Sequence, residues 1–177
     1  MAKRKMTIAA VIAGALLASP LSAADKMNDL EIAHTAYTAG NIDIRYAHLA
    51  LAISENDEVR AFAQTMVRDH TAVNDQAVAL IQRLQVTPQD NALSQTLVKG
   101  AADKRAELMR LSGKQFDCAY ATNELGYHQV VNQTVENNFI PNVTVAPLKE
   151  LLSDALVTFK IHEGHAESMV KNLRCSG

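Results

Sequence analysis

Residues that break helices are scarce in this sequence, which contains four prolines and seven glycines among 177 residues. The strict alternation of polar and apolar residues that is typical of half-buried strands is also missing. Folds built from many short strands are therefore excluded, and we expect an all-α chain. Pro88, Pro141 and Pro147 mark the expected breaks between its helices.

The motifs of several enzyme classes are absent as well. No Cys-x-x-Cys pair occurs, no glycine-rich phosphate loop follows a strand, and the serines are scattered rather than grouped with catalytic partners. Cys118 has no lysine or arginine within three residues to activate its thiol. We therefore expect no catalytic residues and no organic cofactor. An oxidoreductase is an alternative only if a bound metal has an open coordination position.

The first 24 residues have the layout of a secretory signal peptide. A basic start, MAKRK, leads into a stretch of apolar and small residues, with Ser22 and Ala24 just before an expected cut near Asp25. An uncleaved membrane anchor is the alternative, but the apolar run is shorter than the roughly 20 residues that a span requires. We therefore expect a periplasmic or otherwise exported protein with no membrane span after the signal is removed.

The chain that remains after this cut is acidic. Losing Lys3, Arg4 and Lys5 leaves 14 basic residues against 19 acidic ones, a net charge of −5, and no basic cluster survives. Nucleic acids and anionic lipids are polyanions that bind basic surfaces. They are therefore excluded as expected partners, whereas a homo-oligomer is left open.

Apolar residues recur at helical spacing over five segments. These segments predict helices at about 28–53, 57–85, 92–111, 115–138 and 147–174, with a loop at 137–147 before the last helix. Two antiparallel helices, a connecting helical segment and two further helices follow the order of a ferritin-like fold. We therefore predict a ferritin-like antiparallel four-helix bundle with an additional crossover helix, over residues 25–177.

The apolar stripes of these helices carry more ionisable side chains than helix packing needs. Asp43, His70, His128 and His162 lie on the inward stripes, and His165 lies about 60° from His162 around the last helix. A buried carboxylate costs several kcal/mol unless it is paired or bound to a metal. Because imidazole and carboxylate together suit Fe, Mn, Zn or Cu, we predict a single transition-metal ion held by Asp43, His70, His128 and His165, with His162 as the alternative to His165.

A different interpretation of the same residues needs no metal. Glu124, Tyr120 and Tyr127 flank His128 on its helix and would complete a buried Asp–His–Tyr hydrogen-bond network that fixes the packing. The protein would then be a non-catalytic structural or interaction protein of the cell envelope. A carboxylate-bridged di-iron site is not favoured, because the one Glu-x-x-His pair, at 31–34, lies off the inward stripe.

The two cysteines, Cys118 and Cys175, are expected to form one disulfide in an exported chain. Cys118 precedes His128 by ten residues and Cys175 follows His165 by ten. In an antiparallel helix pair, a register that puts the two histidines at the same height therefore puts the two cysteines at the same height as well. Unpaired thiols, or a bridge to another molecule, are the alternatives.

Three stretches carry a resemblance to a known family: VRAFAQTMVRDHTAVN at 59–74, LSGKQFDCAYATNELGYHQ at 111–129 and FKIHEGHAESMVKNL at 159–173. With the first long helix they span most of the chain after the signal. The sequence resembles an exported bacterial family of unknown function with a ferritin-like bundle, often labelled "predicted outer membrane protein". The resemblance implies this fold and export, and it implies no settled activity.

By the same resemblance, the recurring histidines of the family fall on His70, His128 and His165, and the acidic residue of its first helix falls on Asp43. The family more often has glutamate at that position. It usually has Leu-Pro before its last histidine, where this chain has TFKIHEGH.

Overall fold

The computed structural model describes residues 26–175, so the expected signal peptide at residues 1–24 lies outside the described part. The described residues form helices and no strand, which confirms the all-α prediction. In chain order the elements are α1 (Asp29–Ile53), α2 (Asp57–Leu84), α3 (Ala92–Leu108), α4 (Gly113–Thr134), the π-helical turn η1 (Val135–Phe139), α5 (Ile140–Asn142) and α6 (Ala146–Asn172). None of these helices is both long and apolar enough to cross a membrane.

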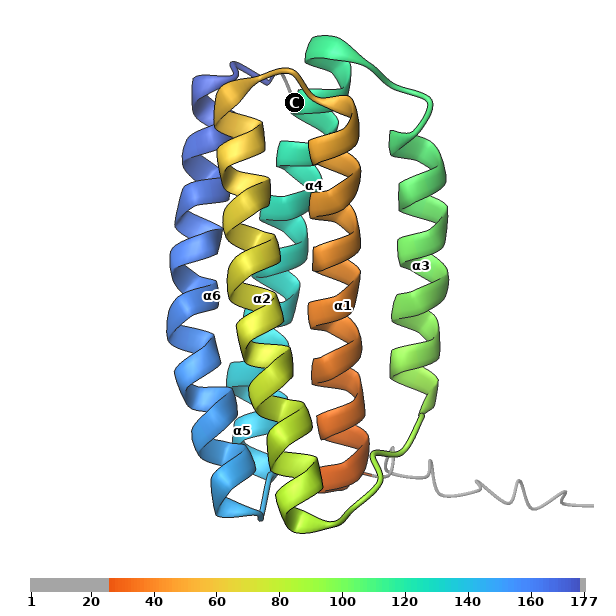
Figure 1. Ribbon diagram of the computed structural model, residues 1–177, viewed down its shortest axis with the longest axis vertical. Coiled ribbons are helices and arrows are strands. Elements are labelled where there is room, and N and C mark those ends of the chain that lie inside the picture. The colour runs from red at the N-terminus through yellow and green to blue at the C-terminus, as the bar shows by residue number, and fades with distance from the viewer. Residues whose placement is uncertain (1–25, 176–177) are drawn as a thin grey trace, which may run out of the picture.

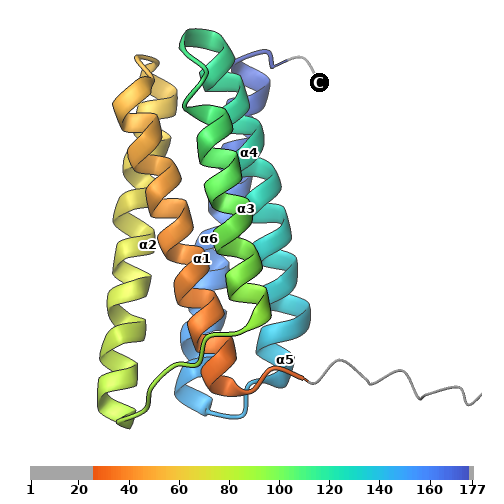
Figure 2. The same cartoon turned by 90° about the vertical axis from the view of Figure 1, so that its right-hand side faces the viewer.

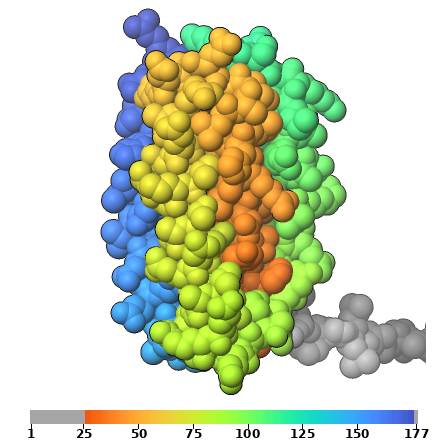
Figure 3. Space-filling view, viewed as in Figure 1, coloured from red at the N-terminus to blue at the C-terminus, as the bar shows by residue number. Residues whose placement is uncertain are grey.

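The four longest helices, α1, α2, α4 and α6, pack side by side, each antiparallel to its neighbours (Figure 1). Helix α3 lies outside this group, against α1 and α4 (Figure 2). It carries the chain back along the length of the bundle, so that α4 begins at the same end as α2. In the space-filling view α1 and α2 form one face, with α6 along one edge and α3 along the other (Figure 3). The inward faces of the four longest helices therefore share one interior.

Asparagine side chains fix where three of the helices begin. Asn28, Asn56 and Asn91 each accept hydrogen bonds from two backbone N–H groups in the first turn of α1, α2 and α3, respectively. Such caps satisfy donors that have no partner within the helix. Pro147 lies in the first turn of α6, where its missing N–H leaves no hydrogen bond unmade. These local signals set the helix starts and, with them, the heights of the residues along the bundle.

The chain between α4 and α6 differs from the predicted loop. Helical backbone continues through η1 and α5 to Asn142 instead of ending near residue 138. Phe139 and Val143, both 4% exposed, are buried in an apolar cluster at this end of the bundle. Their burial stabilises a helical path that the polar residues of this stretch do not favour by themselves.

Two apolar clusters fill the interior, one above the other. The first lies in the half of the bundle that contains the α1–α2 connection and includes the fully buried rings of Phe116 and Tyr120. The second lies in the half that contains the start of α1 and includes Ile32, Leu80 and Leu152. A layer of buried polar and charged side chains separates the two clusters.

Cys118 and Cys175 form a disulfide, with their Cα atoms 5.3 Å apart. The bridge joins the first turns of α4 to the segment just after α6. Helix α6 ends at Asn172, and Arg174 adopts a left-handed backbone conformation with φ of 51°. The Cys175 N–H then donates to the carbonyl oxygen of Val170. Cys175 therefore lies beside the last turn of α6 rather than beyond it.

Removing the disulfide should lower the free energy of unfolding by about 4 kcal/mol, because the bridge joins residues 57 positions apart in the unfolded chain. The measurement is urea-induced unfolding of the wild type, of the Cys118→Ser, Cys175→Ser double variant and of the reduced wild type. The variant and the reduced protein should show the same loss. A loss below about 1 kcal/mol in both would contradict this role of the bridge.

Candidate metal centre

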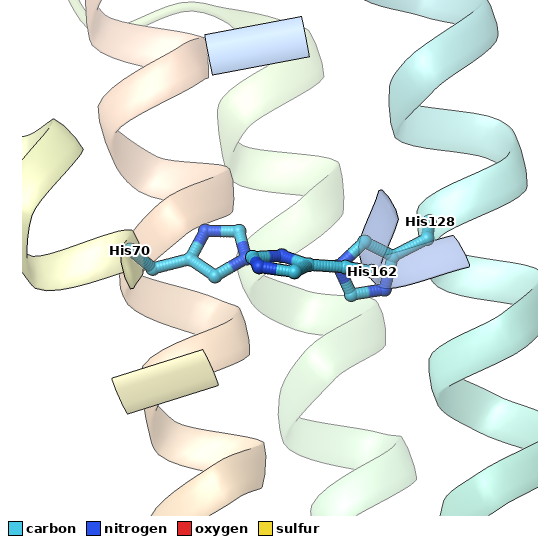
Figure 4. Close-up of side chains that lie close together, drawn as sticks. All are labelled: His70, His128 and His162. Atoms are coloured by element: carbon cyan, nitrogen blue, oxygen red, sulfur yellow. The ribbon is translucent and has the colours of Figure 1, made fainter. Parts of the chain in front are cut away.

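Four buried side chains meet between the two apolar clusters, one from each of the long helices. They are Asp43 from α1, His70 from α2, His128 from α4 and His162 from α6, and each is at most 4% exposed. Each continues the apolar stripe of its helix at a spacing of three or four residues, as His70 does four residues after Met66. Figure 4 shows the three imidazoles reaching toward one another from separate helices.

The distances within this group are short. The ring centroids lie 5.8 Å apart for His70 and His128, 5.4 Å for His70 and His162, and 5.6 Å for His128 and His162. Asp43 Oδ2 lies 2.8 Å from His70 Nε2 and 3.3 Å from His128 Nε2. Ligand atoms of the three histidines lie within 4.8 Å of one another, and so do those of Asp43, Glu124 and His128. Because His128 belongs to both sets, the five side chains form one group, called here the His–carboxylate cluster.

Hydrogen bonds on the far sides of two rings fix which nitrogen faces the buried side. His128 Nδ1 lies 2.9 Å from the backbone carbonyl oxygen of Glu124, to which it donates. His162 Nε2 lies 3.0 Å from Asp69 Oδ2, and Arg68 donates hydrogen bonds to both oxygens of that carboxylate. A neutral imidazole that donates from one nitrogen carries a lone pair on the other. His128 Nε2 and His162 Nδ1 therefore present lone pairs to the interior.

The inward atoms of the cluster have no hydrogen-bond partner in the described part of the chain. They are both carboxylate oxygens of Asp43, Glu124 Oε2, His128 Nε2, His162 Nδ1 and both ring nitrogens of His70. The contacts of Asp43 with the two rings are short but not aligned as hydrogen bonds. Buried polar atoms nearly always have a partner. A lone pair facing a carboxylate oxygen at 3.3 Å is repulsive unless a cation or a proton lies between them, so this geometry suits a bound cation.

Burial and charge together determine how these groups are ionised. Burial alone would raise the pKa of Asp43, but the attraction of His70 and then of His128 lowers it to about 2. Burial and the nearby charge of Asp43 raise the pKa of Glu124 well above its usual value. Burial lowers the pKa of His128, and it lowers the pKa of His162 to about 4. At neutral pH the cluster thus offers an ionised carboxylate and neutral rings at 128 and 162, the protonation states that bind metals.

The tyrosines near the cluster do not complete an Asp–His–Tyr network among the described residues. Tyr127 donates its hydroxyl to the backbone carbonyl oxygen of Ala39, 2.9 Å away, and the buried hydroxyl of Tyr120 has no partner. Neither hydroxyl bonds to Asp43. The ring of Phe159 stacks on His70 with centroids 4.4 Å apart and planes inclined by 13°. Aromatic rings therefore pack around the cluster but form no hydrogen bonds with its polar atoms.

His165 lies apart from the cluster. Its side chain is exposed, and His162 is the residue of α6 that faces His128. The turn at Arg174 explains the difference from the expected register. The chain folds back before Cys175, so this cysteine lies beside the last turn of the helix and not beyond it. Counting ten residues back from Cys175 gives His165, whereas the residue level with His128 is His162, about one helical turn further back.

Two residues of the site have roles that the sequence did not assign. The sequence pattern puts Glu124 on the inward face of its helix and favours the hydrogen-bond network for it rather than a ligand set. The apolar stripes do not mark Asp69, whose carboxylate accepts a hydrogen bond from the ring of His162. The signal for Asp69 is its position directly before His70, which turns it toward α6 at the height of the cluster.

The depressed pKa of His162 predicts a loss of stability in mild acid. Below pH 6.5 the unfolded chain takes up a proton on this ring, whereas the folded protein does not until about pH 4. The free energy of unfolding of the metal-free protein should therefore fall by roughly 2 kcal/mol at His162 between pH 7 and pH 5. Urea unfolding at both values measures it. His162→Gln should remove that part of the pH dependence, while His165→Gln, an exposed control on the same helix, should keep it. An unchanged pH dependence in His162→Gln would count against a neutral buried ring.

Comparisons with known proteins place the chain in a family. A family model for a domain of unknown function, DUF4142, matches residues 16–169, a range that includes every residue of the His–carboxylate cluster. Searches of curated proteins and of solved structures found no match. Since the family model covers most of the sequence, the chain belongs to the DUF4142 family of domains of unknown function.

Proposed function

We propose that this chain is an exported, ferritin-like bundle that binds one transition-metal ion, in metal handling or stress protection. The ligands are His70, His128, His162 and Asp43, with Glu124 beside them; His165 is outside the set. The ferritin-like assignment is supported by the antiparallel order of α1, α2, α4 and α6 and by α3 as the crossover helix.

One observation carries this proposal: lone pairs and carboxylate oxygens face one another in a buried space and have no hydrogen-bond partners among the described residues. A bound cation would pair with all of them at once. It would also balance the charge of Asp43, which is fully buried. The short contacts of Asp43 with His70 and His128 leave the network only partly satisfied, and such a buried network is unfavourable without a further partner.

The chemistry of the ligands narrows the choice of metal. Imidazole nitrogens together with carboxylate oxygens suit Fe, Mn, Zn or Cu, whereas Mg and Ca prefer oxygen ligands. The two ligand triads share His128, which favours a single ion over two separate ones. The carbonyl oxygen of Glu124 and the carboxylate of Asp69 orient two of the rings, as outer partners of metal-binding histidines commonly do.

Export is supported by the layout of residues 1–24 and by the disulfide, because disulfides persist in oxidising compartments. In such a compartment a buried metal site would meet ions from outside the cytoplasm. We therefore place the proposed role, metal handling or stress protection, in the periplasm or another exported location.

The direct test is metal titration of chelator-treated protein by calorimetry, with Zn²⁺, Mn²⁺, Fe²⁺ and Cu²⁺ as separate probes. At least one should bind with a stoichiometry of one. At a free concentration a hundred times the Kd it should stabilise the fold by about 2.7 kcal/mol, seen as a rise in Tm. His128→Gln should weaken binding by about 100-fold or more, because even outer partners contribute 10- to 100-fold, whereas His165→Gln should bind as the wild type does. Failure of all four ions to bind, or equal binding by the two variants, would contradict the proposal.

The outer partner of His162 gives a separate prediction. Asp69→Asn keeps an oxygen that can accept the ring N–H but removes the charge that makes the ring more basic. Metal affinity should fall by roughly tenfold with the stoichiometry unchanged. Asp75→Asn, at an exposed position of the same helix, is the matched control and should have no effect. If both variants bind metal equally well, Asp69 does not support the site.

A further inference from the structure

A cavity of about 170 Å³ lies in the half of the bundle that contains the start of α1. Alanines on three helices, Ala33 and Ala36 on α1, Ala77 on α2 and Ala155 on α6, leave much of this space. Protein interiors are otherwise close-packed, and apolar cavities of similar size take up small apolar molecules. The space is therefore large enough to hold a ligand.

The cavity is elongated and reaches solvent. Its lining includes Leu84, Val86 and Leu93, which are 37–40% exposed and lie near the end of α2 and the start of α3. Val130 of α4, which is 61% exposed, also lines it. Along α1 it extends from Leu30 to Gly40, a length of roughly 15 Å at 1.5 Å per residue. This shape suits an alkyl chain better than a compact ring.

One polar side chain without a partner lies at the inner end. Asn74 is 7% exposed and lines the cavity, and its Nδ2 has no hydrogen-bond partner in the described range. Gly40 provides the room for this amide, since a Cβ at that position would lie 2.6 Å from Asn74 Oδ1. The amide nitrogen is therefore a donor that an acceptor atom of a ligand would satisfy.

Charge restricts the kind of ligand. No basic side chain occurs among the described residues that line the cavity. Asp29 lies at its outer end, and the carboxylate of Asp43 lies one helical turn beyond Gly40. An anionic head group buried here would lose its water without gaining a cation. An uncharged head group avoids that cost.

We propose that this cavity binds an uncharged medium-chain aliphatic molecule, such as an alcohol, an aldehyde or an ester, whose oxygen accepts a hydrogen bond from Asn74. The chain extends along α1 toward the opening near Leu93. This site is separate from the metal cluster, although Phe159 forms a wall of both. It requires no bound metal.

The test is titration of the purified protein with 1-decanol and, separately, with decanoate by calorimetry. Decanol should bind with a stoichiometry of one, and decanoate should bind at least about tenfold more weakly. Ala77→Phe fills the cavity and should weaken decanol binding by about tenfold or more. Ala79→Phe adds the same ring at an exposed position of α2 and should leave binding unchanged. Asn74→Leu keeps the volume but removes the donor, and should weaken decanol binding roughly fivefold.

Three results would overturn the proposal. They are the absence of decanol binding, equal decanol binding by Ala77→Phe and Ala79→Phe, and binding of decanoate as tight as that of decanol. The last result would remove the assignment of an uncharged head group. Circular dichroism checks that each variant is folded. Ala36→Leu, which adds a smaller side chain on the wall formed by α1, replaces Ala77→Phe if phenylalanine unfolds the protein.

Discussion

The carboxylate of Asp43, fully buried against the imidazoles of His70 and His128, is the constraint on which the rest of the structure depends. An uncompensated charge in a protein interior costs several kcal/mol. In the proposed site a cation bound by Asp43 and by histidines of α2, α4 and α6 balances this charge, so the heights and rotations of all four long helices must agree at one level. The helix caps, the crossover helix and the disulfide help to set these heights. Each of them fixes either the residue at which a helix begins or the relative height of two helices along the bundle.

The polar layer divides the bundle into halves with different packing. On one side large rings such as Phe116 and Tyr120 fill the interior, and the disulfide joins α4 to the chain after α6. On the other side small residues leave a cavity that opens to solvent near Leu93. Phe159 and Asn74 lie at the boundary, the first against His70 and the second one turn below it. The half with the disulfide therefore fixes the relative heights of the helices that carry the ligand residues. The half with the start of α1 contains a cavity that a close-packed core would not have.

Helical periodicity was enough to predict the helices and to place Asp43, His70 and His128 on inward faces, because each of them continues an apolar stripe. Periodicity also places His162, rather than His165, on the inward stripe of the last helix. The choice of His165 was supported by its ten-residue spacing from Cys175, and a left-handed turn at Arg174 alters that register by about one helical turn. Spacing along one helix cannot reveal a bond to another helix, and so the role of Asp69 could not be predicted. The helical continuation through Phe139 was hidden for a similar reason, since tertiary burial outweighs the local preference of its polar neighbours.

The central claim is that three imidazoles and a carboxylate from four helices bind the same ion. X-ray absorption spectroscopy of the protein loaded with one equivalent of Zn²⁺ tests it most directly, because imidazole rings give a characteristic outer-shell scattering. We expect a first shell of nitrogen and oxygen near 2.0–2.1 Å, with outer-shell scattering from three rings. A spectrum with one ring or none, as a surface carboxylate site would give, would contradict it.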